Sequence, residues 1–173
     1  PGSLSNHHLG TLLGLLAAAY EMNTFKDEYQ KRVIANAKAF ARALKECGLE
    51  VAGDPAIDFT ETHQVIVNVG YGRGPEAAKR LEDNNIICNY QAMPDEEGFT
   101  VSGALRMGVS EMTRFGMGAA GFRELAVLIS DAVAKNACVI DEVRSLRARF
   151  CELQYCFKGE EVADVLHRMH ELF

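Results

Sequence analysis

The sequence lacks three features that would point to a partner: a basic excess, a long apolar run and paired cysteines. Its 173 residues hold 18 Lys and Arg against 24 Asp and Glu, a formal charge of −6. Nucleic acids and anionic membranes reward clustered basic residues, so this balance argues against both as the main partner. The longest apolar stretch, residues 9–20 (LGTLLGLLAAAY), is shorter than the roughly 20 residues of a membrane span. We expect it to form a buried helix.

The cysteine pattern excludes a disulfide framework. Five cysteines are an odd number, and no two form a CxxC pair. This usage predicts reduced thiols in a cytoplasmic protein. The chain also has no basic leader or signal-peptide cleavage site, and it opens on Pro1 and Gly2 without an initiator Met. We therefore expect it to be a piece of a longer protein.

The remaining composition is that of a globular protein. Hydrophobic residues make up 48% of the chain and charged residues 24%. A chain of this length buries roughly 70% of its unfolded surface, so we expect one good core. The sequence shows no internal repeat, low-complexity stretch or linker.

Periodicity predicts helices at both ends of the chain. Residues 6–22 repeat apolar side chains at helical spacing, with Ser5 as the N-cap. A second helix is expected to start at Thr24 and stop at Gly48, a left-handed C-terminal residue. Beyond these, helices are expected at residues 75–83, 119–135, 139–150 and 160–172.

Three segments between these helices predict strands. They are residues 64–69, 85–89 and 104–109, which are rich in β-branched and apolar side chains. The element order predicts an α+β fold, a small antiparallel or mixed sheet with helices packed on one face. We expect three parts: connecting loop and long helices at 1–47, the α+β core at 48–136, and a C-terminal helical extension at 137–173.

One cation in a predicted strand is the strongest site candidate. Arg106 lies in the glycine-flanked stretch Ser102-Gly103-Ala104-Leu105-Arg106-Met107-Gly108. Burying a guanidinium is costly unless an anion meets it, and its planar fork suits a carboxylate. The alternative is a structural ion pair with one of the 24 acids, and the residues alone leave both open. Arg114 is expected to brace a loop or lie at the surface.

The histidines give weaker signals. His7 and His8, with Ser5 and Asn6, precede the first helix, where backbone N–H groups can bind phosphate. A simply capped helix start is the favoured alternative. His167 and His170 are three residues apart on a helix, but no recognised metal-ligand pattern surrounds them, and a solvated face is favoured over a metal site.

Catalytic motifs are absent from the sequence. It contains no nucleophile elbow, phosphate-binding glycine loop or thiol–histidine motif. Its seven lysines fall in predicted helices or turns, without the strand-end setting of a Schiff-base lysine. The chain alone is therefore predicted to lack a complete active site, and whether it belongs to an enzyme stays uncertain on this ground.

One collinear series of motifs resembles the C-terminal part of serine hydroxymethyltransferases, enzymes with pyridoxal phosphate and the aspartate-aminotransferase fold. Pro1-Gly2 resembles the end of the FPG loop, and residues 25–39 resemble the helix FKxYQxxVxxNAKA. Thr62-His63-Gln64 stands where that family has DNH, and residues 86–89 stand where it has ITVN. The stretches PxD, SGxRxG and TRG are matched by Pro94-Asp95, by residues 102–108 and by Thr113-Arg114 with Gly116. The resemblance covers roughly residues 1–150.

The resemblance implies a function for several residues. The chain would be the small domain of a fold-type I serine/glycine hydroxymethyltransferase of one-carbon metabolism, with the lysine-bearing large domain upstream. Arg106 would hold the α-carboxylate of the amino-acid substrate. Ser5 and Asn6 would lie near the phosphate of pyridoxal 5'-phosphate, across the interface of a homodimer.

Departures from the family pattern indicate a divergent member. Ser5-Asn6 replaces a glycine pair, and Glu111 and Phe115 interrupt the stretch before Gly116. Gln91 stands where the family has an Asn that contacts the folate ring, which weakens the expectation of tetrahydrofolate use. The hypotheses are therefore a transferase acting on a related β-hydroxy or α-substituted amino acid, a folate-independent aldolase-type relative, or a stand-alone binding or assembly module without catalysis.

Overall fold

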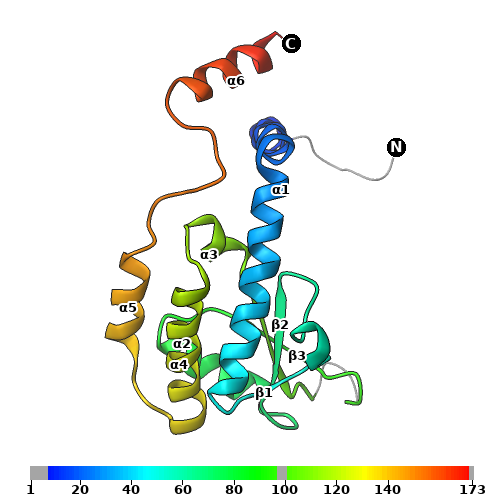
Figure 1. Cartoon of the computed structure of the whole chain (residues 1–173), viewed down its shortest axis with the longest axis vertical. Coiled ribbons are helices and arrows are strands. Elements are labelled where there is room, and N and C mark those ends of the chain that lie inside the picture. Colours follow the sequence, from blue (N-terminus) through cyan, green and yellow to red (C-terminus); the bar gives the residue numbers. More distant parts are fainter. Residues whose placement is uncertain (1–7, 97–100, 172–173) are drawn as a thin grey trace.

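The computed structural model describes residues 8–96 and 101–171, and within them the fold is α+β as predicted (Figure 1). This part of the chain forms six α-helices, one 3₁₀-helix and a four-stranded sheet. The elements in chain order are α1 (Leu9–Glu46), β1 (Glu50–Val51), η1 (Pro55–Ile57), β2 (Gln64–Asn68), α2 (Gly74–Asp83), β3 (Asn89–Gln91), β4 (Ala104–Gly108), α3 (Ser110–Arg114), α4 (Ala119–Lys135), α5 (Ile140–Ala148) and α6 (Glu160–His170). No helix of the described ranges is long and apolar enough to cross a membrane.

The first helix corrects one prediction, because α1 is continuous where two helices were expected. Thr24 is not a cap: its hydroxyl donates to the Tyr20 carbonyl oxygen at 3.1 Å, inside the helix. Such back-bonding often bends a helix. In Figure 1 the first turns of α1 are seen nearly end-on while the rest runs down the molecule, so the helix changes direction. Its end is as predicted, with Gly48 at a φ of 86°.

The apolar first half of α1 corrects a second prediction. It is helical, but it is not buried: Leu12 is 48% exposed and Leu15 is 65% exposed. Burial begins only at Val33, after which Ala37, Phe40 and Leu44 form the inner stripe. The sequence pattern therefore located the helix correctly and its environment wrongly.

The sheet is antiparallel throughout, in the order β1-β2-β4-β3. The strand expected at residues 85–89 lies later, at Asn89–Gln91. Residues 84–86 instead close α2: the Ile86 backbone N–H donates to the Leu81 carbonyl oxygen at 2.9 Å, and Asn85 has a φ of 61°. Because residues 84–86 form the end of α2, they do not pair with β4, and the pairing begins at Asn89.

Alternating side chains give the sheet two distinct faces. Val65, Val67, Leu105 and Met107 are buried and belong to the main hydrophobic cluster. That cluster also includes α1 and α4, whose Phe40 and Phe122 rings lie 5.4 Å apart. The opposite side is termed the polar face here, and it carries Gln64, Ile66, Asn68, Asn89, Gln91, Ala104 and Arg106.

A buried amide connects the core helix to the segment after β4. Asn36 is 2% exposed, and its Nδ2 donates to Thr113 Oγ1 at 3.0 Å and to the Met117 carbonyl oxygen at 2.9 Å. The Thr113 hydroxyl in turn donates to the Val109 carbonyl oxygen at 2.8 Å. A buried polar group is tolerated when it is fully hydrogen-bonded, and this set fixes α3 against α1.

The C-terminal helices differ in what they pack against. α5 contributes Val143 and Leu146 to the main cluster beside α4. α6 lies apart from the sheet, at the end of the molecule where α1 begins (Figure 1). There the Arg168 guanidinium lies 5.1 Å from the centroid of the Tyr20 ring, a cation–π contact.

Candidate functional site

The fold places Arg106 on the polar face of the sheet. Cross-strand register sets it opposite Ile66 on β2 and Asn89 on β3. Its neighbours Leu105 and Met107 point to the other face and anchor the strand in the core. The half-buried guanidinium is thus carried by a well-packed central strand, a rigid mount for a binding group.

No carboxylate of residues 8–96 or 101–171 forms an ion pair or hydrogen bond with Arg106. The alternative of a structural ion pair therefore finds no acid within the described chain. Arg114, Arg80 and Arg149, in contrast, each meet a glutamate. A partly buried guanidinium with free donors is suited to bind an external carboxylate in its fork.

Two amide side chains share the polar face with Arg106. Asn89 is its register partner, and Gln91, which is paired with Ala104, lies two residues further along β3 on the same side. Gln91 is half-buried, whereas Tyr90 between them is 52% exposed. The site thus combines one cation with hydrogen-bonding groups that can both donate and accept.

The loop before β4 is held by a carboxylate that sequence reasoning missed. Glu96 accepts hydrogen bonds from the backbone N–H groups of Met93, at 2.6 Å, and of Gly103, at 2.9 Å. A Cβ on Gly103 would overlap the Glu96 carboxylate, so any other residue there would have to displace that carboxylate. The glycine three residues before Arg106 was a visible signal of this close approach, but its acidic partner could not be identified from spacing.

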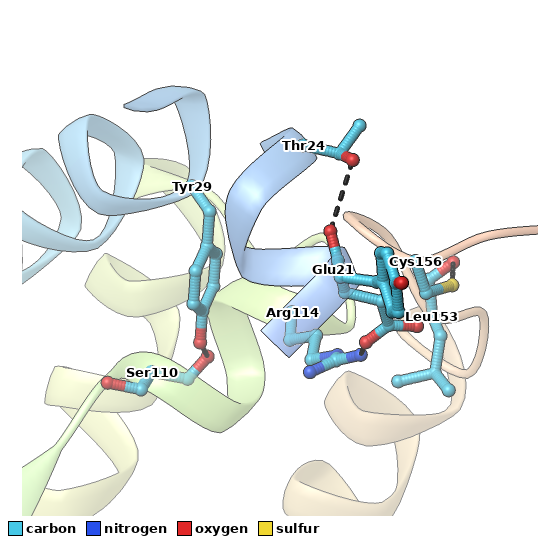
Figure 2. A network of polar contacts seen from close by, with 8 residues as sticks. Glu21, Thr24, Tyr29, Ser110, Arg114, Leu153 and Cys156 are labelled. Carbon is cyan, nitrogen blue, oxygen red and sulfur yellow. Dashed lines mark hydrogen bonds and ion pairs between the residues drawn. The ribbon is translucent and has the colours of Figure 1, made fainter. Parts of the chain in front are cut away.

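Arg114 has the bracing role predicted for it. Its guanidinium pairs with Glu21 on α1, and its carbonyl oxygen accepts from the Gln154 backbone N–H at 2.7 Å. Next to this pair, the Tyr29 hydroxyl donates to the Ser110 carbonyl oxygen at 3.0 Å. Burial raises the Tyr29 pKa, and nearby Arg114 partly opposes that rise. Figure 2 shows the Glu21–Arg114 and Tyr29–Ser110 contacts that join α1 to α3.

The histidine candidates gain no support as ligand sites. His167 Nε2 lies 3.5 Å from the Glu171 carboxylate on an exposed face, and the described residues contain no group of three metal-binding side chains. His8 precedes α1 without a side-chain capping bond. Ser5, Asn6 and His7 lie outside the described residues.

The lysines and cysteines lie in structural or exposed settings. Six lysines are exposed, and the seventh, Lys38, donates to the Ile57 carbonyl oxygen at 2.7 Å. All five cysteines are free thiols. Burial raises the Cys88 pKa to about 11, which keeps this thiol protonated and poorly nucleophilic.

Comparison with known proteins gives one consistent family. The model of the family "Serine hydroxymethyltransferase" matches residues 2–129. The serine hydroxymethyltransferases of Korarchaeum cryptofilum and Archaeoglobus fulgidus are each 40% identical to the chain, over 91% and 93% of its length and 38% of theirs. The chain therefore spans a little over a third of these relatives.

A solved structure of an enzyme with a different activity has a similar fold. The L-threonine transaldolase from Pseudomonas fluorescens, in the internal aldimine state, superposes with a TM-score of 0.76 and 31% sequence identity. The match covers 87% of this chain and 36% of the transaldolase chain.

Proposed function

Because the chain belongs to the serine hydroxymethyltransferase family, we propose that it forms the small domain of a pyridoxal-phosphate enzyme acting on hydroxy-amino acids. The reaction proposed is cleavage or formation of the Cα–Cβ bond. The likeness to an L-threonine transaldolase supports this class of substrate. We further propose the division into residues 1–47, 48–136 and 137–173 as connector, core and helical extension.

The unpaired guanidinium of Arg106 is the observation that carries the proposal. It lies on the polar face of a central strand with no acid from the described chain to neutralise it. A substrate α-carboxylate, held in its fork, would supply the missing charge. Asn89 and Gln91 offer hydrogen bonds beside Arg106, so the carboxylate end of the amino acid would be held in a fixed position.

Pyridoxal phosphate, when bound, supplies the electron sink for the carbanion that Cα–Cβ cleavage leaves. The part of this chain is to orient the substrate: by fixing the carboxylate, Arg106 would set which bond at Cα is positioned to break. Ser5 and Asn6 are proposed to contact the cofactor phosphate. The settings of all seven lysines support a Schiff-base lysine contributed by another part of the protein.

Substitution of Arg106 in the whole enzyme tests the assignment. Arg106→Ala should raise the KM for the amino acid about a hundredfold, because two charge-assisted hydrogen bonds are lost, while cofactor absorbance stays unchanged. Arg106→Lys should restore the KM only in part, since an ammonium cannot bind a carboxylate through two nitrogens as a guanidinium does. Arg123→Ala on the exposed surface of α4 is the matched control. Unchanged kinetics in Arg106→Ala would exclude the role.

A folate-independent, aldolase-type reaction is the second candidate. The position of Gln91 on the polar face favours it, since Gln91 replaces the Asn expected to contact folate. The whole enzyme should then cleave L-threonine at the same rate with and without tetrahydrofolate. A rate that depends on tetrahydrofolate in the wild-type enzyme would reject this candidate.

The remaining proposals concern assembly and location. We propose a homodimer in the cytoplasm, and sedimentation of the purified protein over a range of concentrations tests the dimer. A stand-alone assembly module is the competing hypothesis. Titration with pyridoxal phosphate separates the two, because a module without the large domain should show no aldimine absorbance band.

A further inference from the structure

A second concave site lies on the helix side of the sheet. A cavity of about 330 Å³ opens between α3, α4, α5 and the turn after α2. This volume is within the range of roughly 300–1,000 Å³ typical of small-molecule sites. Its walls are mostly apolar, and they include Met107, Met112, Met117 and Leu125.

Two opposite charges stand among the residues that line this cavity. Glu111 is exposed, and its carboxylate has no side-chain partner within the described part of the chain. Arg147 lies with its guanidinium 4.4 Å from the centroid of the Phe115 ring and donates one N–H to the Phe150 carbonyl oxygen. The same Nη1 also contacts Cys151 Sγ at 3.9 Å, whereas Nε and Nη2 have no hydrogen-bond partner among the described residues. The two charges do not pair with each other, so each can meet a ligand group.

We propose that this cavity binds an apolar α-amino acid as its zwitterion. The ammonium meets Glu111, the carboxylate meets Arg147, and the side chain enters the apolar space lined by Met107, Met112 and Met117. Flexible thioether side chains adapt to several apolar shapes, which suits leucine-like or phenylalanine-like ligands. An amine without a carboxylate leaves Arg147 unpaired, and an acid without an amine leaves Glu111 unpaired.

The cavity is separate from the Arg106 site. Arg106 and Met107 are consecutive in β4, so their side chains point to opposite faces of the sheet. A ligand among the methionines therefore cannot touch Arg106 without passing through the strand. Occupation of the cavity would act on the substrate site only through β4 and α3, which makes it a regulatory or accessory site.

Methionine-methyl NMR on the whole protein gives a direct test. Of the six methionines, Met107, Met112 and Met117 line the cavity, whereas Met22, Met93 and Met169 do not and serve as internal controls. L-Phenylalanine should shift the first three signals saturably and leave the others in place. Phenethylamine and 3-phenylpropionate should each bind about tenfold more weakly, since each lacks one charged contact.

Variants assign the contacts. Glu111→Gln and Arg147→Gln should each weaken L-phenylalanine about tenfold, while Leu125→Phe should block entry by filling the cavity. Val127→Phe, on the exposed side of α4, is the matched control for Leu125→Phe. Arg106→Gln should leave the three shifts unchanged, which separates this site from the proposed substrate site.

Each opposite result overturns the proposal. Absence of saturable shifts in the wild-type protein excludes the site, and equal affinity for all three probes excludes zwitterion recognition. Loss of the shifts in Arg106→Gln would mean that L-phenylalanine acts from the polar face. None of these results depends on the catalytic assignment of Arg106.

Discussion

The two halves of α1 have similar apolar content and opposite environments. The first half contains Leu12, Leu13 and Leu15, all exposed, whereas the second buries Val33, Phe40 and Leu44. The second half has α4 and the sheet to pack against, whereas the contacts of the first half are with Arg114 on α3, Arg168 on α6 and Phe157 in the segment before α6. Burial is thus decided by the surface that is available to a helix, and not by its own composition alone.

The contacts of the two halves also differ in kind. The core half is held by apolar packing and by the buried Asn36 amide. The outer half is held by mixed polar and aromatic contacts: Glu21 with Arg114, Tyr20 with Arg168, and Phe25 with Phe157, whose ring centroids lie 5.4 Å apart. Such contacts are individually weak in water, so the outer half should be the less stable part.

The largest expected effect comes from truncating the core half. Phe40→Ala removes a 2% exposed ring that packs on Phe122, and should cost about 3–5 kcal/mol of unfolding free energy. Leu15→Ala in the outer half should cost less than about 0.5 kcal/mol, as an exposed substitution does. Urea unfolding measures both. Equal losses would show that another surface of the whole protein covers Leu15.

A smaller loss is expected at the buried amide. Asn36→Ala leaves the Thr113 hydroxyl and the Met117 carbonyl oxygen without the donor they share, at a cost of about 1–3 kcal/mol. Asn23→Ala, exposed on the outer half, is the control and should be nearly neutral. If the two substitutions cost the same, Asn36 does not hold α3.

The Glu21–Arg114 pair should contribute less again. Its side chains are 19% and 33% exposed, and a double-mutant cycle with Glu21→Gln and Arg114→Gln should give a coupling of about 0.5–1 kcal/mol. Because partial exposure leaves the pair open to screening, the coupling should fall as salt is raised. A coupling that does not respond to salt would contradict this description of the outer contacts.

The effect that is smallest at neutral pH, and appears only in alkali, concerns the half-buried thiol of Cys88 beside the core. Burial raises the Cys88 pKa to about 11, so the folded thiol keeps its proton at pH values where the unfolded thiol has lost it. Stability is then fully present below the ordinary thiol pKa and decreases as pH rises toward 11. Cys88→Ala should flatten this decrease, whereas Cys138→Ala, at an exposed site, should not. Identical pH curves for the two variants would contradict the burial of Cys88.

Strong local patterns predicted much of the fold. The sequence predicted β2, α2, α4 and the end of α1 at Gly48. In each case the local signal, which is periodicity, Pro75 or the glycine at the helix end, agrees with the final packing. The shifted β3 and the two-residue β1 were not readable, because their pairing depends on β2 and β4 and not on their own residues. The continuity of α1 was missed because Thr24 serves equally as a cap or an interior residue.

The candidate site was predictable in part. Arg106 stood out because a cation between glycines in an apolar strand is unusual. That no acid of the described residues meets it depends on the fold, and only the structure shows it. Glu96 and Asn36 were missed for a related reason: an acid in a polar loop and an amide in a helix look ordinary until their buried partners are known.

The hydrogen bonds of Glu96 help to fix the register of β4 in the sheet. Side chains alternate along a strand, so a slip of one residue would turn Arg106 into the apolar core and Met107 out to the polar face. The two backbone N–H groups bound to the Glu96 carboxylate oppose that slip. The chemical character of each face therefore depends on Glu96, a residue that lies outside the strands.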